Sequence, residues 1–358
     1  MTRRNNAVRG LLAVAALALL GAGCSNNSGG ENGGGGTTPS GGGATPNAAG
    51  GSAQLTGAGG TFPAPLYNNW FQEYGKAHGL TINYQPIGSG GGIKNITAKT
   101  VDFGASDAPM NDTEMKAAPG ILHVPTVAGA VTVAYNVPGV PAHLHLTGPV
   151  IAGIFLGTIK TWNDPQIKQL NPSVNLPASP IIACHRSDGS GTTNIFTTYL
   201  SEVSPEWKSV GAGKSVNWPN GLGGKGNAGV AQLVQKSAGA VGYVELAYVL
   251  QNNITYADVQ NKSGKFIAPS VASATAAVAG VTLPDDFRAV PVNTPAPDGY
   301  PITGFTFLLV YKTGTKPQVK DFLKWALTDG QKDAAGLFYA PLPDPVQKKA
   351  LAAVSSIQ

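Results

Sequence analysis

The sequence predicts an α/β protein with two domains or lobes. From about Ala53 onward, short apolar runs typical of strands alternate with segments whose apolar residues recur at helical spacing. The short spacing of these elements favours largely parallel pairing of the strands. A chain of 358 residues is long enough for two lobes, and its 48 glycines and 27 prolines, with only 12% charged residues, indicate a loop-rich globular protein.

The N-terminus has the features of an export signal, which we place at residues 1–23. Three arginines precede an apolar run at residues 11–20 that is shorter than a bilayer crossing. Small residues stand directly before Cys24, as in a bacterial lipobox, although Gly21 occupies the place of the usual large aliphatic residue. We therefore expect a lipidated Cys24, a membrane anchor and a periplasmic or cell-surface location; plain secretion is the alternative.

Residues 24–52 are expected to form a flexible tether, because Gly, Ser, Thr, Asn, Pro and Ala dominate there and cannot build a core. The net charge of +5 includes the three arginines of the export signal, so the folded part is closer to neutral. It has no basic run with interleaved aromatics, which argues against nucleic-acid binding. If Cys24 is lipidated, Cys184 has no partner for an intramolecular disulfide.

The elements of the folded part follow from their patterning. The first part predicts, in chain order, a strand at 54–58, a helix from Pro63, a strand at 80–87, a short helix around Ile93 and a strand at 101–105. Residues 122–135 predict two strand-like stretches, broken at 127–130, where the chain crosses between lobes. Later predicted elements are helices at 149–156 and 164–170, strands at 180–184 and 241–243, a helix to about Gln235, a strand at 305–310 and two C-terminal helices.

Three loops of one kind are the candidate functional site. They lie at residues 60–62, 88–90 and 189–192, and each follows a predicted strand, contains glycine with serine or threonine, and opens a helix. The start of a helix has unpaired N–H groups and a partial positive charge, so such loops favour an anion. Arg186 adds a full charge and a fork of donors that suits phosphate or carboxylate. An ordinary capped turn with a surface arginine is the alternative for the third loop taken alone.

Asp107, just after the strand at 101–105, indicates which anion the site selects. An ionised carboxylate only accepts hydrogen bonds, so it repels a fully deprotonated anion and binds one that keeps a proton. Phosphate keeps a proton near neutral pH and sulfate does not, so Asp107 would favour phosphate. A loop-capping role is the alternative. Asp188 is expected to hold Arg186 in place rather than to contact the ligand.

Five segments together resemble the phosphate-binding protein of the bacterial phosphate-specific ABC transporter. They lie, in the family's order, at residues 55–65, 88–92, 101–109, 186–192 and 221–227, and the resemblance extends from about Ala53 to Leu342. It implies a type II periplasmic-binding-protein fold, in which two α/β lobes joined by a hinge close over one phosphate in the cleft between them. On this basis we expect lobe I at residues 53–127 and 302–358, and lobe II at residues 128–301.

The resemblance also implies the ligand contacts. Carried over motif by motif, the expected phosphate ligands are Thr61, Phe62 through its backbone N–H, Ser89, Asp107, Arg186, Ser190, Gly191 and Thr192. Gly90 stands where family members often have a second serine, which leaves these contacts untouched, and a structural role is expected for the loop around Lys225. The implied function is high-affinity extracytoplasmic phosphate binding and delivery to the permease subunits of the importer, by a monomer without cofactor, metal or catalytic residue.

An enzyme is the alternative from another functional class, namely a surface hydrolase or phosphatase that uses Ser190. Asp188 occupies the first glycine position of the G-x-S-x-G pattern, and His185 is too close in sequence to serve as a base for Ser190. His143 and His145 lack cysteine or carboxylate company for a metal, and residues 88–94 lack the ending of an ATPase phosphate loop. A binding protein for a sulfate-like oxyanion and a surface adhesin that keeps the fold are the remaining alternatives.

Overall fold

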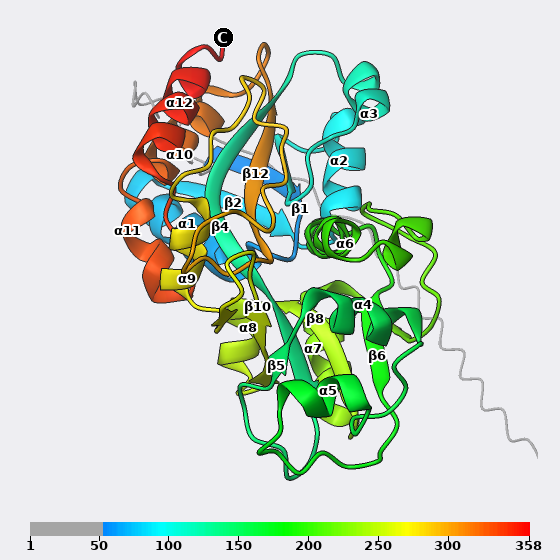
Figure 1. Cartoon of the computed structure of the whole chain (residues 1–358). Coiled ribbons are helices and arrows are strands. Elements are labelled where there is room, and N and C mark those ends of the chain that lie inside the picture. The colour runs from blue at the N-terminus through cyan, green and yellow to red at the C-terminus, as the bar shows by residue number, and fades with distance from the viewer. Residues whose placement is uncertain (1–52) are drawn as a thin grey trace, which may run out of the picture. The chain divides into compact units, whose positions relative to one another are not determined.

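A nine-stranded mixed sheet organises residues 53–358, the part of the chain that the computed structural model describes (Figure 1). Its strands follow the order β2-β1-β3-β12-β4-β8-β6-β7, and β9 also pairs with β4. A second sheet has the order β11-β10-β5. The expected export signal, the lipidated Cys24 and the tether lie outside the described residues.

The strands and helices have the following bounds. The strands are β1 (Ala53–Gly59), β2 (Leu80–Gln85), β3 (Phe103–Ser106), β4 (Ile121–Asn136), β5 (His145–Leu146), β6 (Ile182–Arg186), β7 (Leu222–Gly224), β8 (Ala240–Glu245), β9 (Thr255–Tyr256), β10 (Asp258–Gln260), β11 (Phe266–Ile267) and β12 (Thr303–Tyr311). The helices are α1 (Ala64–His78), α2 (Ser89–Thr97), α3 (Asp112–Ala117), α4 (Gly148–Leu156), α5 (Pro165–Leu170), α6 (Gly191–Val203), α7 (Gly226–Lys236), α8 (Leu246–Gln251), α9 (Val271–Val278), α10 (Pro317–Ala326), α11 (Gln331–Ala334) and α12 (Asp344–Ser355), with 3₁₀ turns η1 (Glu206–Ser209) and η2 (Ala335–Leu337).

The strand β4 divides the large sheet into two halves, as Figure 1 shows. Residues 121–130 pair with β12, and residues 131–136 pair with β8. We call β1, β2, β3, β12 and the first part of β4 the first half, and the rest of β4 with β6, β7, β8 and β9 the second half. One strand thus belongs to both halves of the sheet, at the place where residues 122–135 were predicted to cross between lobes. The predicted break at 127–130 is wrong, because β4 is one continuous strand of 16 residues. Its register against β12 shifts between Pro125 and Val127, and its pairing partner changes after Ala130.

The prediction of largely parallel pairing holds for only part of the sheet. The strand pairs β1–β2, β1–β3, β6–β7 and β6–β8 are parallel, as expected. The long strands β4 and β12 instead run antiparallel to each other and to their other neighbours β8 and β3. Both are buried along nearly their whole length, so their apolar runs carry no sign of direction.

The core forms around the predicted apolar faces. The helix predicted from Pro63 is α1, and its apolar residues at helical spacing are all buried: Leu66, Tyr67, Trp70, Phe71 and Tyr74. The ring of Phe71 lies 5.3 Å from that of Phe322 in α10. Trp162 is fully buried and donates its ring N–H to the Gly239 carbonyl. None of the helices within residues 53–358 combines the length and hydropathy needed to cross a membrane.

Candidate anion-binding site

The residues predicted from the three loops come together between the two halves of the sheet. Thr61 follows β1, Ser89 opens α2 and Asp107 follows β3, whereas Arg186 ends β6 and Gly191 opens α6. Gly88, directly before α2, has φ 89°, a conformation that favours glycine. The predicted side chains with polar groups are buried, from fully so in Ser89, Ser190 and Thr192 to 7% exposed in Thr61.

Ser89 links the first half to the start of α6. Its hydroxyl oxygen accepts the N–H of Asp107 at 3.1 Å and the N–H of Gly191 at 3.0 Å. The same hydroxyl donates to Asp107 Oδ2 at 3.3 Å. The predicted ligands Ser89, Asp107 and Gly191 therefore lie within direct contact of one another, although 102 positions separate Ser89 from Gly191.

Asp107 is a buried carboxyl whose charge depends on pH near the physiological range. Burial raises its pKa to about 6, and hydrogen bonds from Thr306 and Ser89 and the charge of Arg186 act in the opposite direction. Thr306, on β12, donates to Oδ1 at 2.9 Å. Above pH 6 the group is an acceptor only, and below pH 6 it carries a proton that it can donate.

Arg186 is held by Asp188, as the sequence predicted. Its Nε and Nη2 donate to the two carboxylate oxygens of Asp188 at 2.8 and 2.6 Å, and Nη1 donates to Thr192 Oγ1 at 3.4 Å. Gly226 N–H donates to Asp188 at 3.0 Å. Burial acts to raise the pKa of Asp188, but the hydrogen bonds and charge of Arg186 outweigh it and lower that pKa. Three of the five guanidinium N–H groups are engaged, which leaves two for a ligand.

Ser190 is the N-cap of α6. Its hydroxyl accepts the N–H of Thr193 at 3.1 Å, and its own N–H donates to the carbonyl of Lys214 at 2.8 Å. The hydroxyl keeps its proton for donation, but the Ser190 backbone N–H is already used. The helix α6 has 13 residues, so its N-terminus provides the partial positive charge expected for this loop.

Asn227 is a site residue that the sequence reasoning missed. It is fully buried at the start of α7, and its side-chain amide donates to Thr61 Oγ1 at 3.0 Å and to Thr192 Oγ1 at 3.1 Å. Its backbone N–H also donates to Thr61 Oγ1, at 3.1 Å. Asn227 thus joins predicted ligands of both halves. The signal was present, because residues 222–227 repeat the pattern of a strand, a glycine turn and a helix start.

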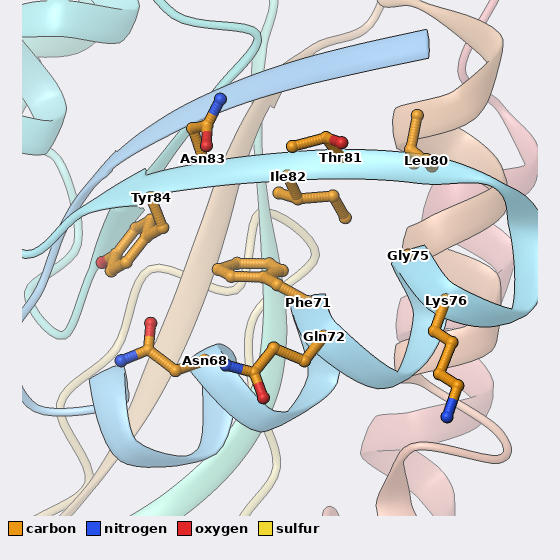
Figure 2. Close-up of a pocket in the computed structure, with 10 residues that line it drawn as sticks. All are labelled: Asn68, Phe71, Gln72, Gly75, Lys76, Leu80, Thr81, Ile82, Asn83 and Tyr84. Atoms are coloured by element: carbon orange, nitrogen blue, oxygen red, sulfur yellow. The ribbon is translucent and has the colours of Figure 1, made fainter. Parts of the chain in front are cut away.

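A separate cavity of about 450 Å³ lies between α1 and β2 (Figure 2). Asn68, Phe71, Gln72 and Lys76 of α1 face Ile82 and Tyr84 of β2 there. It is lined by none of the predicted ligand residues, so it is not the site to which the three loops converge. Among the described residues, no group of three or more His, Cys, Asp or Glu side chains could hold a metal ion.

Two α/β halves with buried anion donors between them are the architecture of a periplasmic-type binding protein. Residues 44–330 match the family model described as a PBP superfamily domain. A solved structure of a high-affinity periplasmic phosphate-binding protein, PfluDING, aligns with a TM-score of 0.68 at 22% identity, over 84% of this chain and 93% of that chain. The expected type II periplasmic-binding fold is confirmed by this likeness.

Curated relatives define the family more closely. The chain is 47% identical over 303 residues to the phosphate-binding protein PstS of Pasteurella multocida. This alignment covers 82% of this chain and 88% of that protein. It is also 45% identical over 306 residues to PstS of Xylella fastidiosa, and this alignment covers 83% of this chain and 84% of that protein. The chain therefore belongs to the PstS family of phosphate-binding proteins. This is a family of binding proteins rather than enzymes, so the hydrolase alternative for Ser190 is not favoured.

Proposed function

We propose that this protein binds inorganic phosphate outside the cytoplasm and delivers it to the permease subunits of an ABC importer. The names of its curated relatives support the ligand. The observation that carries the proposal is the meeting of Asp107 and Ser89 with the start of α6 beside Arg186. This arrangement combines a cation, a helix N-terminus and a carboxylate acceptor, and a partly protonated oxyanion can use all three.

The proposed ligand set keeps the eight residues expected from the sequence. Arg186 supplies charge with its two remaining N–H groups, and the N–H groups of Phe62 and Thr192 supply dipoles. The Gly191 N–H joins them by exchanging its bond to Ser89 Oγ for one to the anion. The hydroxyls of Thr61, Ser190 and Thr192 donate to phosphate oxygens. The Ser89 hydroxyl does so by giving up its bond to Asp107 Oδ2, which leaves that carboxylate to accept the proton that phosphate retains. Such charge-assisted hydrogen bonds contribute roughly 1.5–3 kcal/mol each, offset by the dehydration of the anion, so they do not sum to an affinity.

We further propose that binding proceeds by hinge closure between lobe I at residues 53–127 and 302–358 and lobe II at residues 128–301. The change of pairing partner at residues 130–131 of β4 supports a boundary in this strand. Hinge closure brings Thr61, Ser89 and Asp107 from one lobe against the Arg186 loop of the other. Small-angle scattering should therefore detect compaction on phosphate addition, and an unchanged radius of gyration would contradict it.

The location and the anchor are also part of the proposal. Export by the segment at residues 1–23 and lipidation of Cys24 would hold a monomer at the membrane while the tether lets it reach the permease. The apolar run and the small residues before Cys24 support this assignment. Mass spectrometry of the native protein tests it, since a lipid mass on Cys24 is expected, and Cys24→Ser should release the protein from the membrane fraction.

The experiment that tests the function is calorimetric titration of the protein with phosphate, arsenate and sulfate at pH 7.5. We expect phosphate to bind far more tightly than sulfate. Asp107→Asn should reduce the ratio of phosphate affinity to sulfate affinity by at least about 100-fold, because repulsion between like charges at close range costs several kcal/mol. Ser209→Ala, which removes a hydroxyl bonded only to the Glu206 carbonyl, serves as a control that keeps the ratio. Equal affinity for the two anions in the unmodified protein would contradict the role of Asp107.

The pH dependence of sulfate binding tests the same carboxyl. The pKa of Asp107 is raised to about 6, so the group gains a proton as the pH falls through this value. A protonated Asp107 donates to sulfate instead of repelling it, whereas the charge of sulfate itself does not change. Sulfate affinity should therefore rise between pH 8 and pH 5 in the unmodified protein and stay nearly constant in Asp107→Asn. Parallel pH profiles of the two proteins would refute this assignment.

An ion pair outside the proposed ligand set should slow the dissociation of phosphate. Lys214 Nζ lies 2.8 Å from Glu114 Oε2 on α3, and the Lys214 carbonyl accepts the Ser190 N–H. Partly exposed pairs contribute about 0.2–1 kcal/mol, so Lys214→Met should accelerate phosphate dissociation by up to roughly fivefold. The effect should shrink at 1 M salt. Stopped-flow measurement checks this, with Lys265→Met, which breaks the exposed pair with Asp298, as the matched control.

A further inference from the structure

Three tyrosine hydroxyls hold three consecutive carbonyls of the first binding loop. Tyr84 donates to Gly60 O at 2.7 Å, Tyr248 donates to Thr61 O at 2.6 Å and Tyr339 donates to Phe62 O at 2.7 Å. The three tyrosines come from β2, from α8 and from the segment after η2. Figure 2 shows Tyr84 on β2 beside the ring of Phe71, and the two ring centroids lie 5.5 Å apart.

Two of these bonds control the direction of the next N–H group. A peptide unit is planar and trans, so its C=O and the following N–H point in opposite directions. The bond from Tyr84 to Gly60 O therefore orients the Thr61 N–H, and the bond from Tyr248 to Thr61 O orients the Phe62 N–H. A hydrogen bond at the carbonyl also polarises the peptide and makes its N–H a better donor. Pro63 has no N–H, so the bond from Tyr339 fixes the entry into α1 instead.

Tyr248 differs from the other two because it reaches the loop from the second half of the sheet. It lies on α8, which directly follows β8, whereas Thr61 directly follows β1 of the first half. Tyr84 lies within the first half, and the segment of Tyr339 is tied there through the bridge between Ala340 and Ala128. Separation of the two halves would therefore break the Tyr248 bond and keep the other two.

Glu245 fixes the start of α8 from which Tyr248 projects. Its Oε2 accepts the N–H of Ala247 at 3.0 Å and lies 3.2 Å from the Tyr339 hydroxyl oxygen. Burial raises the pKa of the Glu245 carboxyl well above its ordinary value. The Tyr339 hydroxyl donates to the Phe62 carbonyl at 2.7 Å and, over a longer distance, to Glu245 Oε2 at 3.2 Å.

We propose that Tyr248 is a positioning residue for anion binding: its hydroxyl reaches across to the Thr61 carbonyl and turns the Phe62 N–H toward the anion when the two halves close. This inference rests on the proposed phosphate binding. Tyr248 itself touches no ligand in this scheme. It couples closure to the alignment of a donor, so its loss affects the closed state and not the open one.

The test is Tyr248→Phe, which removes one hydroxyl and keeps the ring. Phosphate affinity should fall about tenfold, mainly through faster dissociation, because the lost bond exists only when the halves are closed. Tyr135→Phe is the matched control, since the Tyr135 hydroxyl donates to the Pro141 carbonyl, away from the loop and from the proposed boundary, and it should bind phosphate within twofold of the unmodified protein. Thermal unfolding of all proteins verifies that they fold.

Amide NMR spectra of the phosphate-bound proteins distinguish positioning from a general structural effect. The Thr61 carbonyl also accepts the Ala64 N–H at 3.3 Å, so Tyr248→Phe removes one of its two bonds. Tyr248→Phe should move the Phe62 amide signal upfield, and Tyr84→Phe should move the Thr61 signal, because each follows the carbonyl that loses a tyrosine bond. Unchanged affinity with an unchanged Phe62 signal in Tyr248→Phe would overturn the inference alone. Failure of the unmodified protein to bind phosphate would overturn the proposed function first. If Tyr248→Phe does not fold, the unmodified protein alone provides the test. A Phe62 amide signal that does not shift when phosphate is added would then overturn the inference.

Discussion

Replacing Gly191 with alanine is expected to weaken phosphate binding by at least about 100-fold without destabilising the fold. A Cβ at this position would lie 2.5 Å from Asp107 Cβ and 2.6 Å from both Asp107 Oδ2 and Ser89 Oγ. Carbon atoms in proteins do not approach so closely, so the first turn of α6 must move away from the first half of the sheet. A displacement of about 1 Å is enough to misalign several charge-assisted hydrogen bonds at once.

The stability of Gly191→Ala should be equal to or higher than that of the unmodified protein. Gly191 is the first residue of α6, where alanine is the better helix former by up to about 1 kcal/mol. The clash arises between the two halves, so opening of the cleft relieves it. Calorimetric titration and thermal unfolding together measure both quantities, and small-angle scattering should detect no compaction of this variant on phosphate addition.

Two other glycines provide a graded control for Gly191→Ala. A Cβ at Gly90 would lie 3.3 Å from Gly189 Cα, a tight contact that a shift of a few tenths of an ångström relieves, so Gly90→Ala should weaken binding only slightly. A Cβ at Gly336 meets nothing within 4 Å, so Gly336→Ala should bind phosphate normally. Normal phosphate affinity in Gly191→Ala would show that the contact of Gly191 with Asp107 is absent from the bound state.

The fold was predictable where periodic apolar residues mark an element. The buried face of α1 and the strands β1, β2, β3 and β6 follow from patterns of this kind. The direction of β4 and β12 was not predictable, because a strand buried on both faces has the same apolar run in either direction. The six-residue helix α8 also escaped prediction, since a Glu245 side-chain cap and tertiary contacts define it more than its own periodicity does.

The candidate site was predictable to the extent that local sequence builds it. Glycine loops between strands and helices place Thr61, Ser89 and Arg186 at strand ends, and strand ends of a parallel sheet meet. The residues that support them could not be found in this way. Asn227 reaches Thr61 across 166 positions and Tyr248 reaches it across 187, so these contacts exist only through the tertiary fold. The pattern of a strand, a glycine turn and a helix start marks the loop that carries Asn227 but not its partners, and no local pattern marks Tyr248.

Arg186→Ala is expected to lower phosphate affinity by roughly 1,000-fold, because two charge-assisted hydrogen bonds of about 1.5–3 kcal/mol each are lost with the cation. The same change leaves Asp188 without its ion-pair partner. The Asp188 side chain is only 15% exposed, and breaking a buried pair from one side typically costs 3–5 kcal/mol of stability. A loss of binding in the single variant could therefore arise from partial unfolding as well as from the missing ligand contact.

The double variant Arg186→Ala with Asp188→Asn separates these two causes. Asparagine removes the unpaired charge and can still accept the Gly226 N–H, so most of the lost stability should return. Phosphate affinity should stay low, because the cation is still missing. The phosphate affinity of Arg186→Lys should lie between those of the unmodified protein and Arg186→Ala. An ammonium keeps the charge but cannot bind Asp188 through a fork and phosphate at the same time. Thermal unfolding and calorimetric titration measure both properties. Recovery of binding to within tenfold of the unmodified protein in the double variant would mean that Arg186 serves the fold rather than the anion.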